Sequence, residues 1–314
     1  MTEIAVSSNP SGARSFSLAL RDIKLAHSVF ALPFALLGGA LAVPAGAPVA
    51  RTAGQAALIV VCMVAARTVA MLVNRVADRR FDAANPRTAG RAVASGALAV
   101  RAAGWMIAAS AAVFVLGCAG FVFFGNWWPV ALSAPTLGLV SFYSFTKRFT
   151  SLAHVFLGLA LAASPVAAAI AVAPGSVGLD GAGVTASGAA TLLLAGFVAL
   201  WVAGFDVLYA LQDLEFDRGA GLRSIPAALG ARGAAWASRG LHVGAFVLLV
   251  LAVRTEPRLG ALMYGAVAVV GAALIAEHWV LVRRGLAGLP MAFFTLNGVV
   301  SVVVGCVGVC DLVV

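Results

Sequence analysis

Two short acidic stretches, NRVADRRFD at residues 74–82 and DVLYALQDLEFD at residues 206–217, each end a long apolar run of this chain. The sequence of 314 residues holds only 12 Asp and Glu, and six of those 12 lie in these two stretches. A carboxylate inside hydrocarbon costs roughly 2.5 to 3.5 kcal/mol, so this concentration at the edge of apolar runs indicates a function. The alternative to a function is that the two stretches are solvated helix ends, where Asp and Arg often gather. Two copies of the same pattern make this alternative less favoured.

The composition predicts an all-α integral membrane protein. Hydrophobic residues make up 62% of the chain and charged residues 11%, whereas an average soluble domain has about 25% charged residues. Because period-two alternation is absent and backbone groups in lipid must bond within the protein, we expect transmembrane helices and no barrel. Nine apolar stretches are long enough to cross about 30 Å of hydrocarbon: residues 25–47, 54–77, 102–123, 127–146, 152–174, 187–211, 234–253, 259–282 and 291–311.

The positive charges are concentrated on one side of these nine predicted helices. Of the 21 Lys and Arg, 17 lie in the N-terminal segment or after the second, fourth, sixth and eighth stretches, while Arg51, Arg254 and Arg258 lie on the opposite side. By the positive-inside rule, this asymmetry predicts a cytoplasmic N-terminus and an external C-terminus. Both acidic stretches then face the cytoplasm. A net charge of +9 could indicate nucleic-acid binding, but this distribution of the basic residues argues against it.

The chain is expected to form one domain after a short tail. Residues 1–15 are polar and have no apolar stretch beside a small-residue cleavage site. We therefore predict a disordered cytoplasmic tail over residues 1–15, not a signal peptide, and a single transmembrane domain over residues 16–314.

Helix geometry places the acidic residues of each stretch on one face. With about 100° per residue, Asp78 and Asp82 fall about 40° and 80° from Asn74, and Arg67 falls at about 20°, if the helix continues to Asp82. In the second stretch, Asp213 and Asp217 fall at the same angles from Tyr209, and Asp206 at about 60°. Glu215 falls near 240°, so we expect it to point away from the others. The offset of 135 residues between Asp78 and Asp213 indicates that the two helices are counterparts in two halves of one bundle.

Facing pairs of carboxylates form an oxygen-rich site of the kind that Mg²⁺ prefers. Mg²⁺ typically binds one or two carboxylates and shares its other positions with water and substrate phosphate. Neither stretch contains His or Cys, which argues against zinc or copper. With the nearby arginines, the pattern predicts a magnesium site that holds a diphosphate.

The two stretches match the signatures NxxxDxxxD and DxxYxxxDxxxD at every position, and the chain therefore resembles the UbiA superfamily of membrane prenyltransferases. Similar flanks extend through residues 27–34, 85–91, 143–148 and 221–226. These flanks resemble the 4-hydroxybenzoate polyprenyltransferase branch, including relatives that prenylate dihydroxynaphthoate on the futalosine route to menaquinone. One departure is the segment RAVASG at residues 91–96, where relatives commonly carry two prolines. Without them we expect a more mobile loop or a helical turn.

The resemblance implies Mg²⁺-dependent transfer of a polyprenyl group from polyprenyl diphosphate to an aromatic acid, 4-hydroxybenzoate or similar, in ubiquinone or menaquinone biosynthesis. It also implies an active site on the cytoplasmic side of the inner membrane and a cavity between the helices that opens laterally to lipid. The implied metal ligands are Asp78, Asp82, Asp213 and Asp217. The implied substrate-binding residues are Asn74, Arg91, Lys147, Arg148, Arg223 and His27, and the implied catalytic residues are Asp206, Tyr209 and Arg67.

Several alternatives remain open at this point. Tyr209 could be an interfacial aromatic anchor, and His27 could be a packed core histidine. The acceptor could be dihydroxynaphthoate, homogentisate, a tetrapyrrole or glycerol phosphate. An ion-coupled transporter is an alternative of another class, which predicts acidic residues near the span centres and interrupted helices.

Overall fold

The computed structural model describes residues 30–313, so the expected tail at residues 1–15 and His27 lie outside the described residues. The α-helices of this part of the chain are α2 (Leu32–Leu41), α3 (Val49–Ala77), α4 (Arg79–Ala84), α5 (Val100–Gly120), α6 (Trp128–Ala131), α7 (Ser133–Thr146), α8 (Ala153–Val172), α9 (Ala186–Tyr209), α10 (Leu214–Gly219), α11 (Ile225–Thr255), α12 (Ala261–Arg284), α13 (Asn297–Val302) and α14 (Gly308–Val313). Short 3₁₀ segments are η2 (Phe121–Phe124), η3 (Pro174–Ser176), η4 (Ala210–Asp213) and η5 (Gly285–Gly288), and π-helical segments are η6 (Met291–Leu296) and η7 (Val303–Val307). Between residues 30 and 313 the only β pairing is one isolated bridge.

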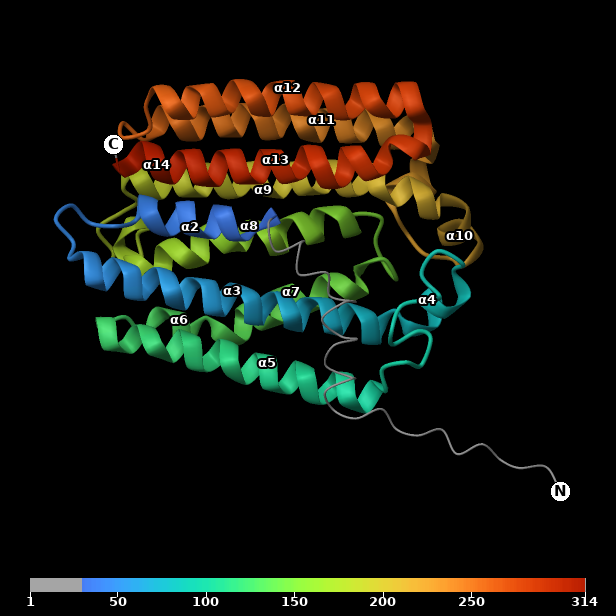
Figure 1. Ribbon diagram of the computed structural model, residues 1–314, viewed down its shortest axis with the longest axis horizontal. Helices are drawn as coiled ribbons and strands as arrows, with labels where there is room; N and C mark the ends of the chain where they lie inside the picture. Colours follow the sequence, from blue (N-terminus) through green and yellow to red (C-terminus); the bar gives the residue numbers. More distant parts are fainter. Residues whose placement is uncertain (1–29, 314) are drawn as a thin grey trace.

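The long helices lie side by side in one bundle (Figure 1). Helix α9 packs against α8 and α11, while α3 packs against α5 and α7, and α2 against α8. The core follows one face of α9, where Phe197 and Trp201 are fully buried and Phe205 is almost so. Trp201 contacts Phe34 of α2 edge-on. A helix that is apolar on all sides is buried by its neighbours, which accounts for the central position of α9.

Seven helical stretches between residues 30 and 313 are long and apolar enough to cross a membrane, so the expectation of nine spans is not confirmed. The expected span at residues 25–47 is partly outside the described residues, and its described helix, α2, has 10 residues. At about 1.5 Å per residue, α2 covers about 15 Å, half of the hydrocarbon thickness.

The expected span at residues 127–146 is divided into α6 and α7, which meet at Leu132. Pro135 lies in the first turn of α7. Its ring has no N–H to donate and would clash with the carbonyl of Ala131, four residues earlier, so a straight helix cannot pass this point. The proline is visible in the sequence, but an expectation based on hydropathy alone does not take it into account.

Small residues allow close approach of the helices around α8. A Cβ added at Gly158 would lie 2.2 Å from the carbonyl oxygen of Ala199 in α9, and one at Gly38 of α2 would lie 2.3 Å from the carbonyl oxygen of Pro165. Side chains larger than hydrogen at these two positions would push the helices apart.

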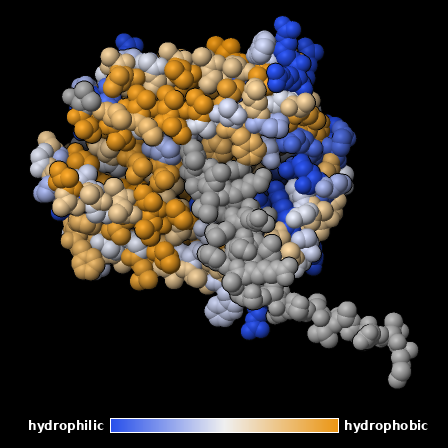
Figure 2. Space-filling model, in the orientation of Figure 1, coloured by the Kyte–Doolittle hydropathy of each residue, from blue (hydrophilic) through white to orange (hydrophobic). Residues whose placement is uncertain are grey.

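The short helices α4 and α10 lie at the same end of the bundle (Figure 1). Figure 2 shows hydrophilic residues gathered at that end and a broad hydrophobic surface over the rest of the visible face. Arg51 lies at the opposite end of the bundle, in the first turn of α3, whereas Arg75 lies in the last turn of α3. These two basic residues of α3 thus lie at opposite ends of the helix, on the sides that the sequence predicts for them. The assignment of this end to the cytoplasm stays a prediction.

Candidate active site

Both acidic motifs are bent at their middle aspartate. Asp78 ends α3 with φ −91° and ψ 6°, and α4 begins at the next residue. Asp213 is the last residue of the 3₁₀ segment η4, with φ −102° and ψ 4°, and α10 begins at the next residue. The assumption of one straight helix through each motif is therefore wrong. Across the bend in the first motif, the backbone N–H of Asp82 still donates a hydrogen bond to the carbonyl of Asp78 at 2.8 Å. This bond keeps the two aspartates within one turn.

The two motifs line the same cavity, which has a volume of about 760 Å³. Asp78, Asp82, Asp206, Asp213 and Asp217 all line it. Along α3 the lining extends from Ile59 to Asp78, which corresponds to about 28 Å of helix. Apolar residues line the part remote from the aspartates, among them Ile59, Cys62, Phe114, Phe121 and Pro129. The cavity therefore has a charged end, formed by the two motifs and the loops at residues 85–91 and 147–148, and a long apolar part. Its lateral opening to lipid stays a prediction.

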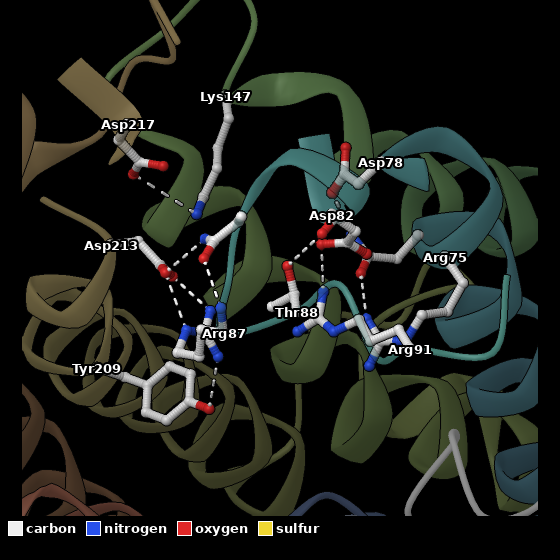
Figure 3. Close-up of polar contacts among 12 residues, drawn as sticks. Arg75, Asp78, Asp82, Arg87, Thr88, Arg91, Lys147, Tyr209, Asp213 and Asp217 are labelled. Atoms are coloured by element: carbon white, nitrogen blue, oxygen red, sulfur yellow. Dashed lines mark hydrogen bonds and ion pairs between the residues drawn. The ribbon is translucent and has the colours of Figure 1, made fainter. Parts of the chain in front are cut away.

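Arg87 joins the two motifs. It follows α4 of the first motif, yet its Nε and Nη2 donate to Oδ1 and Oδ2 of Asp213 in the second motif, at 2.9 and 2.5 Å. Asn85 donates a further bond of 3.0 Å to Asp213 Oδ1 (Figure 3). Burial alone would lower the pKa of Arg87, but the bonded carboxylate of Asp213 outweighs burial and raises it. A two-pronged pair of this kind fixes orientation as well as charge.

Three of the other four motif aspartates, Asp78, Asp82 and Asp217, also have an Arg or Lys near them. Arg91 Nη1 donates to Asp82 Oδ1 at 2.7 Å. The remaining pairs are longer: Arg148 Nη2 to Asp78 Oδ1 at 3.5 Å, and Lys147 Nζ to Asp217 Oδ2 at 4.0 Å (Figure 3). Asp78 also accepts from Asn74 Nδ2 at 3.0 Å. Burial raises the pKa of Asp78, and the charge of Asp82 adds to this, whereas Lys147 and Arg148 oppose it.

The segment at residues 91–96 forms a helical turn, one of the two outcomes expected for a chain without prolines there. The N–H of Ser95 donates to the carbonyl of Arg91 at 2.8 Å, and Leu98 N donates to Ala92 O at 2.8 Å. Ala92 and Val93 are buried against Leu72 of α3. This packing holds the loop that carries Arg91 close to the first motif.

The donor set fits a hard divalent cation. Among the described residues, Oδ2 of Asp82 and Oδ2 of Asp217 are buried without a hydrogen-bond partner, and the cation beside the latter, Lys147 Nζ, is 4.0 Å away. A buried carboxylate oxygen in that state is costly unless a cation or donor comes closer. Between residues 30 and 313, no three His, Cys, Asp or Glu side chains converge on one point. An ion here would thus take one or two carboxylates and complete its shell with water and phosphate oxygens, as Mg²⁺ commonly does.

Arg67 and Tyr209 line the cavity beside the charged end. The Nε of Arg67 is buried with no hydrogen-bond partner among the described residues, which suits a ligand contact. The Tyr209 hydroxyl accepts from Arg87 Nη1 at 3.4 Å, and its ring lies 4.2 Å from that of Phe293, centroid to centroid. Its position inside the cavity disfavours the alternative of an interfacial anchor.

Two other expectations concern Arg223 and Glu215. Arg223 does not line the cavity; its Nη1 donates to Phe149 O and its backbone N to Lys147 O, each at 2.7 Å. The structure thus places Arg223 behind the loop that carries Lys147, and a direct substrate contact is not supported. Glu215 is exposed and also outside the cavity lining, as the helix arithmetic predicts.

Sequence reasoning missed Asn85, Arg87 and His154 as site residues. Asn85 and Arg87 belong to a segment whose resemblance was recognised, but no spacing rule shows that the loop crosses to the second motif. The sequence gives no role to His154, because its partner is 52 residues away. In the structure, Nδ1 of His154 lies 2.6 Å from Oδ2 of Asp206.

The model of the UbiA prenyltransferase family matches residues 31–299. The chain belongs to this family. The motif aspartates lie at bent helix ends beside basic loops, which agrees with a prenyltransferase site and not with the midspan acids expected of a transporter.

Curated relatives agree with the family assignment. The chain is 31% identical over 229 residues to a "4-hydroxybenzoate octaprenyltransferase" of Xanthomonas campestris, a match covering 72% of this chain and 64% of that protein. A protein of the same name from Paracidovorax citrulli is 35% identical over 168 residues, covering 52% of this chain and 50% of that protein. This UbiA-family chain thus matches half to two thirds of the length of these relatives.

Solved structures share the fold. A UbiA homolog from Aeropyrum pernix K1, in its apo form, aligns with a TM-score of 0.78 at 31% identity, over 91% of this chain and 98% of that one. A UbiA homolog from Archaeoglobus fulgidus bound to GPP and Mg²⁺ aligns with a TM-score of 0.69 at 16% identity, over 95% of this chain and 100% of that one. At that lower identity the second likeness shows the fold alone.

Proposed function

We propose that this protein transfers a polyprenyl group from polyprenyl diphosphate to an aromatic acid, 4-hydroxybenzoate or a similar hydroxyarene carboxylate, with Mg²⁺ as cofactor. The observation that carries the proposal is the cavity itself: two acidic motifs and basic loops form one end, and the rest is apolar. A prenyl diphosphate has the same division into a charged head and a hydrocarbon tail. The names of the curated relatives support an aromatic acid as the acceptor.

The charged end binds the diphosphate in this proposal. Arg91, Lys147 and Arg148 line that end and Arg67 lines the cavity farther along α3, and guanidinium groups suit two-pronged contacts with phosphate oxygens. Arg87 also lines it, so it is an additional candidate. The apolar part along α3 receives the first isoprene units of the tail, because burial of apolar surface there is favourable.

Asp78, Asp82, Asp213 and Asp217, with the amide of Asn74, are the proposed holders of Mg²⁺. When bound, the metal supplies positive charge that stabilises the diphosphate as it leaves. The ion pairs of the four aspartates keep these side chains in place before substrate arrives.

The reaction breaks the allylic C–O bond of the donor and forms a C–C bond to the ring carbon beside the acceptor hydroxyl. Asp206 is the proposed acceptor of the hydroxyl proton, since it lines the cavity beyond the four aspartates and has one carboxylate oxygen bonded to His154. Tyr209, one turn away on α9, is placed to hydrogen-bond the acceptor. Exclusion of water by the surrounding apolar side chains protects the allylic cation from hydrolysis.

The proposed setting is the cytoplasmic membrane, with the charged end toward the cytoplasm and membrane lipid around the apolar surface. The product would serve ubiquinone or menaquinone biosynthesis. Nucleic acid is not a proposed partner.

Purified protein in lipid nanodiscs, given radiolabelled polyprenyl diphosphate and Mg²⁺, tests the function. The acceptor panel comprises 4-hydroxybenzoate, dihydroxynaphthoate, homogentisate, a tetrapyrrole and glycerol phosphate. We expect a prenylated product with a hydroxyarene carboxylate and none after EDTA. If product forms only with glycerol phosphate or a tetrapyrrole, the proposed acceptor class is wrong. If the folded protein forms no product with any acceptor, the proposed prenyl transfer is contradicted.

A further inference from the structure

A buried histidine lies directly behind Asp206. His154 is in the first turn of α8, and its side chain is fully buried, whereas that of Asp206 on α9 is 20% exposed. Nδ1 of His154 lies 2.6 Å from Oδ2 of Asp206. Asp206 lines the cavity and His154 does not. The histidine therefore does not line the acceptor space itself, and its hydrogen bond into that space is to the carboxylate of Asp206.

The surroundings of the second ring nitrogen indicate which group donates in this pair. Nε2 of His154 is buried and has no hydrogen-bond partner in the part of the chain that the structure describes. A protonated imidazole, or the tautomer with hydrogen on Nε2, would leave a buried N–H unsatisfied, which is costly. The tautomer with hydrogen on Nδ1 leaves only a lone pair there. His154 is thus the donor and Asp206 the accepting carboxylate.

Helix packing fixes the distance between the two groups. Four residues after His154, Gly158 allows the backbone of α8 to touch the carbonyl of Ala199, seven residues before Asp206 on α9. His154 and Gly158 share one face of α8, and Ala199 and Asp206 share one face of α9. The pair is therefore held by a backbone contact and not by a flexible side chain.

We infer that His154 is a positioning residue for the acceptor: it fixes one carboxylate oxygen of Asp206, so that the other receives the proton of the acceptor hydroxyl. The inference rests on the proposed prenyl transfer. Oδ1 of Asp206 makes no hydrogen bond with the described residues. As the ring carbon bonds to the prenyl carbon and the diphosphate leaves, the hydroxyl proton passes to Asp206. Asp206 returns it to the same oxygen when the ring carbon gives its own proton to the released diphosphate and the ring becomes aromatic again.

If His154 acts in this way, the effect of replacing it should depend on how acidic the acceptor hydroxyl is. Comparing kcat for two acceptors of different acidity therefore tests the inference. In His154→Leu, kcat with an acceptor that has an ordinary phenol should fall by at least about tenfold, which is less than the roughly 10²- to 10⁴-fold effect of a general base because Asp206 itself remains. A ring-fluorinated acceptor, whose hydroxyl releases its proton more easily, should lose much less relative to wild type. The dissociation constant for the prenyl diphosphate, measured without acceptor, should stay unchanged. His154→Asn should keep kcat within about threefold, because its amide can donate to Asp206 in place of Nδ1.

His278→Leu is the matched control. His278 contacts His242 between α12 and α11, outside the cavity lining, and its replacement should leave the ratio between the two acceptors unchanged. Equal losses for both acceptors in His154→Leu, with no rescue in His154→Asn, would overturn the inference in favour of a purely structural histidine. A His154→Leu enzyme as active as wild type would overturn it as well. Absence of transfer by the wild-type protein would instead overturn the proposed function.

Discussion

Asp78 and Asp213 occupy equivalent bends in the two halves of the bundle. Each is the middle aspartate of its motif, and their backbone angles differ by 11° in φ and 2° in ψ, from −91° and 6° to −102° and 4°. A helix that bends at the same motif position in both halves presents its carboxylates toward the shared cavity from two sides. This relationship supports the interpretation of the two helices as counterparts.

Equivalent positions should have equivalent effects on catalysis. We expect Asp78→Ala and Asp213→Ala each to reduce prenyl transfer by at least about a hundredfold, because each removes a charge that stabilises the departing diphosphate. Glu215→Ala is the matched acidic control and should retain most activity, since Glu215 is exposed and outside the cavity lining. Gel filtration in detergent checks folding. Near-normal turnover in either aspartate variant would contradict the assigned ligand roles.

Arg87 should stabilise the protein before metal and substrate bind. In Arg87→Ala, Asp213 keeps Asn85 but loses its charged partner, and a buried carboxylate without a cation is destabilising. We expect Tm to fall by several degrees in metal-free buffer, and the loss to shrink when Mg²⁺ and diphosphate are added. Arg87→Lys should lose less, because it keeps the charge but not the two-pronged geometry. A Tm equal to wild type in Arg87→Ala would refute this role for the pair.

Mg²⁺ binding should depend on diphosphate. Because no three acidic side chains converge among residues 30–313, the metal alone has too few protein ligands for tight binding. Inorganic diphosphate should therefore increase the Tm shift caused by Mg²⁺, and by linkage Mg²⁺ should increase the affinity for diphosphate. Thermal unfolding over a grid of both ligands measures this. A full Tm shift with Mg²⁺ alone would show that the carboxylates rearrange into a complete site without substrate.

A clasp at the opposite end of the bundle should make stability depend on pH. Glu256 accepts from Arg258 Nε at 2.9 Å, and Arg258 also donates to the carbonyl of Leu41 and the hydroxyl of Ser187. Burial alone would raise the pKa of Glu256, but the bonds from Arg258 outweigh burial and hold it below its ordinary value of 4.5. The clasp thus contributes stability above pH 4.5 that is lost as the pH falls through the lowered pKa.

Glu256→Gln should therefore be less stable than wild type at pH 7, by about 1 kcal/mol or less, because Arg258 is partly exposed. The difference should narrow as the pH falls below 4.5 and the wild-type carboxyl protonates. Thermal unfolding of both proteins from pH 7 to pH 3.5 measures it. A difference that stays constant with pH would show that the effect comes from packing and not from the ionised pair.

The grouping of the aspartates within each motif was predictable because it depends on local spacing. Residues four apart on a helix share a face whatever the rest of the chain does, so the sequence alone placed Asp78 with Asp82 and Asp213 with Asp217. Apolar runs of the right length likewise indicated membrane helices without knowledge of their neighbours. Glu215 is exposed as expected, although the straight helix assumed for that expectation is interrupted at Asp213.

The pairings between the halves were decided by tertiary structure. Arg87 bonds to a carboxylate 126 residues away and His154 to one 52 residues away, and such partners depend on how helices pack, which helix periodicity does not specify. The division of one expected span into α6 and α7 depended on a proline at a position that hydropathy ignores. Sequence determined which residues have the chemistry; packing determined which of them meet, because contacts between distant segments follow from the shapes of the helices that bury each other.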